Sequence, residues 1–142
     1  MKILKIIPFL LSTSAFAFDK HEDAWGKAEG KGVCEAMVTE GFDNEILVSC
    51  DCGSGFVDEI SITLKKPLSK DFNVLMTFDN LKPISVPTRD GNIVADTRKG
   101  KANFKKVLGL FRKHKSVKVE FPNGRHATFT LKGSSSALKA CP

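Results

Sequence analysis

The sequence predicts a mainly-β domain, a small β-sandwich or partly open barrel, with one amphipathic helix packed on it and disulfide staples. Three observations predict this class. Short runs of alternating apolar and polar residues are separated by turn residues, one longer segment has helical period, and four cysteines follow an export signal. The 142 residues divide into a signal peptide (1–17), an N-terminal extension (18–32) and a single β-rich domain (33–142).

The N-terminal segment has the organisation of a secretory signal peptide. Lys2 and Lys5 precede an apolar run that is too short to span a bilayer, and the small residues Ala15 and Ala17 suit cleavage before Phe18. A buried N-terminal strand or helix is the alternative interpretation. Since no later segment approaches the roughly 20 apolar residues of a transmembrane helix, we expect a periplasmic or secreted mature protein without a transmembrane anchor.

The four cysteines are expected to form disulfides, because oxidising compartments preserve them. The runs on either side of a turn-like stretch at residues 41–44 predict a β-hairpin. Its register places Cys34 opposite Cys50, which leaves Cys52 for Cys141. We therefore predict the pairs Cys34–Cys50 and Cys52–Cys141. A zinc site is the alternative, but Cys-Asp-Cys lacks the spacing of zinc knuckles and the histidines are distant in sequence.

Further strands follow with a period of two residues. Pro83 assigns one of them to a sheet edge or an irregular extended segment. Asp90-Gly91 supplies the positive φ of a tight turn before the next. In order, these runs are 60–64, 72–78, 81–86 and 93–95.

One helix is predicted from about Lys101 to His114. Gly109 inside it costs about 1 kcal/mol relative to alanine, so the helix depends on docking to a sheet. Its apolar residues fall at i, i+3, i+4 and i+7 and make one stripe: Phe104, Val107, Leu108 and Phe111.

A second hairpin and a short helix complete the domain. The turn Phe121-Pro122-Asn123-Gly124 joins runs 117–121 and 127–131 and keeps their apolar residues on one face. Residues 134–138 then form a capped turn of helix that leads into Cys141.

Charge is distributed unevenly along the mature chain. From Phe18 to Asn80 there are 6 basic and 13 acidic residues, whereas from Leu81 onward there are 14 basic and 3 acidic. A basic C-terminal half favours docking of a protein partner with acidic groups, or of an anionic envelope polymer. A solvated outer face of an amphipathic helix is the alternative. The candidate binding residues are Lys101, Lys105, Lys106, Arg112, Lys113 and Lys115.

Nucleic acid is excluded as a partner, because an exported disulfide protein seldom meets it and no aromatic residues interleave the basic run to stack bases. The sequence does not predict an oligomeric state.

The sequence contains no complete set of residues with the spacing of a known catalytic motif. Ser136 and Lys139 have the Ser-x-x-Lys spacing of penicillin-recognising enzymes, but the other motifs of that class are absent from the sequence. His114 and His126 flank a strand that carries Glu120, without a nucleophile beside them. We therefore predict a protein that is not an enzyme, with no catalytic residues, no cofactor and no metal site.

Several segments resemble two kinds of small exported β-protein, the VasI-like family associated with type VI secretion and the invasion-associated locus B-like family. One departure is Thr77-Phe78-Asp79, where the VasI-like strand often has arginine before the acidic residue. The segments that carry the resemblance are Leu47-Val48-Ser49-Cys50, Val74 to Phe78, Asp90-Gly91, Phe104-Lys105-Lys106-Val107-Leu108, Ala127 to Gly133, and Ser136-Ala137-Leu138 with Cys141.

This resemblance implies a periplasmic or surface accessory protein without established catalysis. We therefore expect a non-enzymatic exported binding protein, associated with the cell envelope or secretion machinery, that docks an acidic partner through its basic C-terminal half. The alternative is an inhibitor or immunity-type protein that blocks an envelope hydrolase. A blocker of cationic lysozymes would need an acidic face, which the first half of the chain offers.

Overall fold

The computed structural model describes residues 21–142, so the predicted signal peptide and its cleavage site lie outside the described residues. The larger sheet contains β1 (Gly26–Gly30), β2 (Val33–Glu40), β3 (Asn44–Asp51), β4 (Glu59–Leu64) and β7 (Asn92–Val94). The smaller sheet contains β5 (Phe72–Phe78), β6 (Ile84–Thr88), β8 (Ser116–Glu120) and β9 (His126–Thr130). Two helices are described, α2 (Arg98–Lys113) and the short α3 (Ser134–Ala137).

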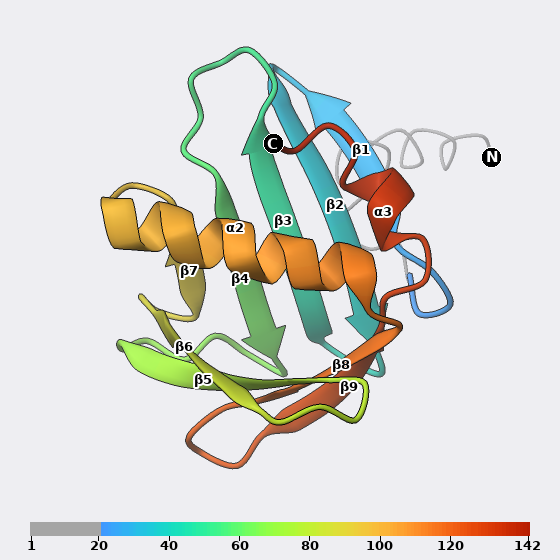
Figure 1. The fold of residues 1–142 in the computed structure, drawn as a ribbon, viewed down its shortest axis with the longest axis vertical. Coiled ribbons are helices and arrows are strands. Elements are labelled where there is room, and N and C mark those ends of the chain that lie inside the picture. The colour runs from blue at the N-terminus through green and yellow to red at the C-terminus, as the bar shows by residue number, and fades with distance from the viewer. Residues whose placement is uncertain (1–20) are drawn as a thin grey trace, which may run out of the picture.

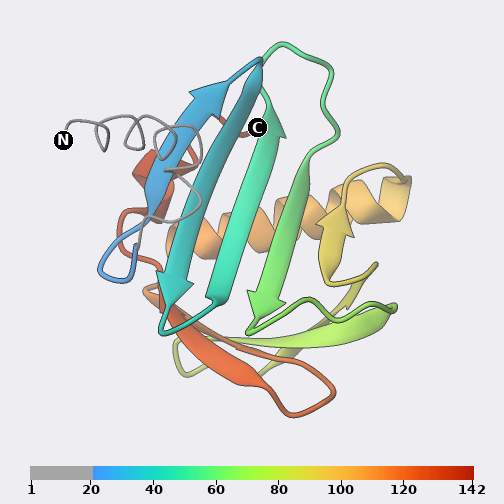
Figure 2. The ribbon, with the colours of Figure 1, turned by 180° about the vertical axis from the view of Figure 1, so that it is seen from behind.

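The two antiparallel sheets confirm the predicted mainly-β class. Their strand orders are β1-β2-β3-β4-β7 and β6-β5-β8-β9, and within residues 21–142 neither sheet closes into a barrel. Helix α2 crosses one face of the larger sheet, and the smaller sheet lies at one end of it (Figure 1). The opposite face of the larger sheet has no described helix over it (Figure 2). Within residues 21–142 the larger sheet therefore has one covered and one open face.

The core lies between α2, the covered face of the larger sheet and the smaller sheet. Alternation along β2, β3 and β4 turns one set of side chains toward α2, and these are almost completely buried. The helical stripe predicted from the sequence is buried against them. Its four members are Phe104, Val107, Leu108 and Phe111.

Both predicted hairpins have the expected register. Ala36 pairs with Val48 across β2 and β3, and Val117 pairs with Phe129 across β8 and β9. Strand β6 pairs only with β5 and contains Pro87, as an edge strand can.

The predicted N-terminal extension contributes to the domain. Within residues 18–32, the segment Gly26–Gly30 forms β1 at the edge of the larger sheet and pairs with β2. Trp25 is buried, and its indole nitrogen donates to the carbonyl oxygen of Thr130 at 2.8 Å. The ordered domain therefore begins before residue 33.

The predicted disulfide pairing is wrong, although the register behind it is correct. Cys34 does lie opposite Cys50, but the bonds are Cys34–Cys52 and Cys50–Cys141, with Cα separations of 5.7 and 5.6 Å. Cys52 follows β3 on the same side as Cys50, so it is the diagonal neighbour of Cys34. The segment after α3 returns to the buried side chain of Cys50, so Cys141 forms the disulfide with Cys50.

Helix α2 begins three residues before the predicted start. The Thr97 hydroxyl accepts from the backbone amide of Gly100 at 2.9 Å and caps the helix. At Gly100 the helix passes so close to β7 that an added Cβ would collide with the carbonyl oxygen of Val94. Gly109, by contrast, is exposed and would meet no atom within 4 Å.

Candidate functional site

Helix α2 carries seven basic residues and no acidic one. Six of the seven are exposed and project away from the sheet; we call these six the basic face of α2. In the part of the chain that the structure describes, none of them forms an ion pair, since the two ion pairs are Arg89–Asp96 and His114–Asp79. The basic face consists of Arg98, Lys99, Lys101, Lys105, Lys106 and Lys113.

The position of these charges follows from the docking of the helix. Because the apolar stripe faces the sheet, the remaining positions face solvent and carry the lysines. The first turn contains Arg98, Lys99 and Lys101, although cations are unfavourable at the positive end of a helix dipole by about 0.3–1 kcal/mol each. The charge of the first turn does not stabilise the helix, which favours a role of these residues in binding.

The structure brings four of the six predicted binding residues together on this face: Lys101, Lys105, Lys106 and Lys113. Lys115 is exposed beyond the helix, in the linker to β8, where its backbone amide donates to Asp79. It is therefore adjacent to the basic face without belonging to it.

Arg112 is not available for a partner. One guanidinium nitrogen donates to the carbonyl oxygens of Leu138 and Cys141 at 2.7 and 2.9 Å. The other has a longer contact of 3.5 Å with the carbonyl oxygen of Pro142. Arg112 thus holds the segment that follows α3 and belongs to the structural framework.

A cleft of about 580 Å³ lies beside the basic face. One wall is the first half of α2, and the other is the loop between β3 and β4 together with Pro142. Phe56 and Val57 from this loop are 38% and 46% exposed. We call it the Phe56 cleft. It joins an apolar surface to Lys101 and Lys105 of the basic face.

No pattern in the sequence predicts the Phe56 cleft. Phe56 and Val57 lie in a loop without strand or helix period, and Pro142 is brought to it by tertiary contacts, the Cys50–Cys141 bond and the hydrogen bonds of Arg112. Two consecutive apolar residues after Gly53-Ser54-Gly55 are the only local signal of an exposed apolar loop.

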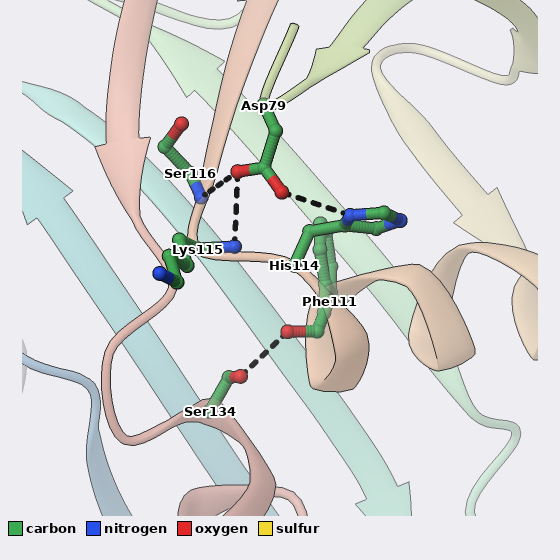
Figure 3. A network of polar contacts seen from close by, with 6 residues as sticks. All are labelled: Asp79, Phe111, His114, Lys115, Ser116 and Ser134. Atoms are coloured by element: carbon green, nitrogen blue, oxygen red, sulfur yellow. Dashed lines mark hydrogen bonds and ion pairs between the residues drawn. The ribbon is translucent and has the colours of Figure 1, made fainter. Parts of the chain in front are cut away.

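The two histidines considered as catalytic candidates lie at opposite ends of β8. His114 precedes the strand, whereas His126 pairs with its last residue, Glu120. His114 Nδ1 lies 3.0 Å from Asp79 Oδ2 (Figure 3). This pair joins the end of α2 to the end of β5.

Asp79 collects three hydrogen bonds at this junction. Besides His114, the amides of Lys115 and Ser116 donate to its second oxygen at 3.1 Å each (Figure 3). The bond from His114, followed by those of the amides, holds the pKa of Asp79 below its usual value. Nearby, the buried hydroxyl of Ser134 donates to the carbonyl oxygen of Phe111 at 2.6 Å. These contacts fix the end of α2 to the two segments beside it.

Two disulfides are a feature of proteins that fold outside the cytoplasm. Among the helices of residues 21–142, none is long and apolar enough to cross a membrane. A family model described as YfjT matches residues 23–138. Comparison with curated proteins and with solved structures gives no match.

Proposed function

The chain belongs to the YfjT family, and we propose that it is a non-enzymatic binding protein that docks an acidic partner protein through the basic face of α2. The observation that carries this proposal is the set of six exposed basic side chains on one helix, unpaired within the described residues. Such a surface attracts and orients a partner of opposite charge.

The dimensions of the basic face favour a protein partner. From Arg98 to Lys113 the helix rises by about 22 Å, at about 1.5 Å per residue. The charges are fixed to a helix that is buried along its other side, so they form a patch of defined shape. A patch of this length suits one acidic helix or strand of a partner.

The proposed place of action is the cell envelope. The disulfides support it, and so does the signal peptide predicted to end near Ala17. In this proposal the mature protein is periplasmic or secreted and acts as an accessory to envelope or secretion machinery, as the VasI-like resemblance implies.

Charge reversal on the basic face tests the proposal. Lys101, Lys105, Lys106 and Lys113 would be replaced together by glutamate. The control variant reverses four exposed lysines outside α2, so both variants change the net charge equally: Lys66, Lys70, Lys82 and Lys118.

The oxidised wild-type protein would be used to capture and identify its partner from envelope extract, with elution in rising salt. We expect reversal on α2 to weaken binding of that partner at least tenfold and to flatten its salt dependence, because the complementary charges are lost. The control variant should bind like the wild type. Unchanged affinity of the α2 variant, or recovery of mixed anionic polymer only, would contradict the proposal.

A second candidate function uses the open face of the larger sheet. Alternation places Glu35, Glu45 and Glu59 on this face, opposite the side that packs on α2. Partial burial, with a smaller contribution from Glu35, raises the pKa of Glu45. An acidic sheet face suits a cationic partner, so an inhibitor of a cationic envelope hydrolase is the alternative proposal. Inhibition that survives charge reversal on α2 but not Glu45→Lys would favour it.

A further inference from the structure

We propose that the Phe56 cleft receives an apolar side chain, preferably an aromatic one, from the acidic segment of the partner that docks on α2. This inference rests on the proposed function and adds to it the chemistry of the segment that is recognised. The predicted ligand is a segment with one exposed aromatic residue between carboxylates.

The size and lining of the cleft suit such a side chain. Its volume of about 580 Å³ lies within the range of about 300–1,000 Å³ in which proteins bind small groups. Phe56 and Val57 line one side, and Ala102 of α2 and Pro142 line the others. All four are exposed, so burial by a ligand would remove apolar surface from water.

The charged side chains on the α2 wall of the cleft are basic. Lys101 and Lys105 line it and have no ion pair within the described residues. The carboxylates that line the cleft have donors inside the chain. Asp51 accepts from the loop amides of Gly53, Ser54 and Gly55 at 2.8–2.9 Å.

The other two carboxylates are engaged as well. Asp58 accepts from the amide of Asp51 at 2.8 Å, and Asp96 forms an ion pair with Arg89 at 2.7 Å. None of the three is ion-paired to a cleft lysine. Hydrogen bonds do not cancel the charge of a carboxylate, so a carboxylate of the partner would approach the α2 wall, where Lys101 and Lys105 lack a counter-charge.

Both disulfides hold one wall of the cleft, which is the loop between β3 and β4 together with Pro142. Cys52 starts the loop that carries Phe56 and is bonded to Cys34 in β2. Cys141 precedes Pro142 and is bonded to Cys50 in β3. A wall that is covalently cross-linked loses less conformational entropy when a ligand binds, which favours affinity.

The probe is a labelled nine-residue peptide of alternating aspartate and glutamate with a central phenylalanine, and its matched control has alanine at the centre. Binding to the oxidised protein is measured by fluorescence anisotropy at several salt concentrations. We expect the phenylalanine peptide to bind at least tenfold more tightly, because its ring is buried in the cleft.

Two variants locate the site. Ala102→Trp fills the cleft while every charge is kept, and it should remove the advantage of the phenylalanine peptide. Leu81→Trp adds the same side chain at a position that is 56% exposed outside the cleft, and it should bind like the wild type. Val57→Ser is a second variant that shortens the apolar wall, for use if Ala102→Trp fails to fold.

The possible results separate the two proposals. Equal affinity for both peptides would overturn the cleft inference and leave the basic face of α2 as the binding surface. Absence of salt-dependent binding by either peptide would overturn the proposed function as well. If the protein self-associates and Phe42→Ser abolishes that association, the occupant of the cleft is a second copy of the chain, whose Phe42 is 81% exposed between β2 and β3. That result would also overturn the inference.

Discussion

Replacing Gly109 with alanine should raise the free energy of unfolding by about 1 kcal/mol, whereas the same change at Gly100 should lower it. Gly109 is exposed in the interior of α2, and an added Cβ would meet no atom within 4 Å. Alanine then gains helix propensity, worth about 0.8–1.0 kcal/mol relative to glycine, at no steric cost.

At Gly100 the same Cβ would collide with the carbonyl oxygen of Val94. Carbonyl oxygens of a strand cannot rotate away, so the first turns of α2 must move off β7. Overpacking of this kind costs about 1–3 kcal/mol, which exceeds the gain in propensity. We expect a net loss of up to about 2 kcal/mol.

The assay is urea unfolding of the oxidised proteins, followed by far-UV circular dichroism, with thermal unfolding as a second measurement. A change of 1 kcal/mol corresponds to about 3–6 °C in Tm for a domain of this size. Shifts of the same sign at both positions would refute the close approach of α2 and β7 at Gly100. A changed m-value would show instead that the denatured or native state had altered in compactness.

Three further predictions concern the framework around α2. Replacing Cys50 and Cys141 together with alanine should lower the free energy of unfolding in urea by about 4–5 kcal/mol, and removing the Cys34–Cys52 bond should lower it by about 3 kcal/mol. The difference is expected because the bonds span 91 and 18 residues. An equal or smaller effect of removing Cys50–Cys141 would contradict the observed pairing. Asp79→Asn should destabilise the protein at neutral pH, because the pKa of Asp79 is lowered in the folded state. The difference in unfolding free energy between wild type and variant should be complete above the usual carboxyl pKa of about 3.9 and should shrink as the pH falls through the lowered pKa. A difference that stays constant with pH would exclude this linkage. Arg112→Met should lower the free energy of unfolding by about 1–3 kcal/mol and speed amide hydrogen exchange at residues 138–142, because three contacts with carbonyl oxygens are lost. Unchanged exchange there would show that Arg112 does not hold this segment.

Local patterns predicted most elements of the fold. The stripe of α2 has a clear helical period, and the two hairpins have turn residues that fix their registers. Strand β1 lacked such a signal, because its sequence Gly-Lys-Ala-Glu-Gly has no β-branched or large apolar residue. It forms a strand because β2 offers a free edge and Trp25 anchors its start.

The failures at the candidate site have a common physical origin. In the sequence, Arg112 has the same pattern as the lysines around it, but its hydrogen-bond acceptors come from a segment more than 25 residues later. The disulfide pairing failed for a related reason. Cys34 has two possible partners on neighbouring positions of β3 and the loop after it, and the return of Cys141 decides between them. Contacts of this kind depend on tertiary structure and leave no local period.

The crossed order of the disulfides affects how the protein reaches its native state. Cys50 lies between Cys34 and Cys52 in the sequence, so the loops closed by the two bonds overlap. Three of the four thiols precede Cys141 by many residues, and the β2–β3 register places Cys34 opposite Cys50, with which it is not bonded in the native protein. Where a Cys34–Cys50 bond forms, thiol–disulfide exchange has to release Cys50 before both native bonds can form. Because Cys141 bonds to Cys50, docking of the C-terminal segment favours the native pairing of the three cysteines that precede it.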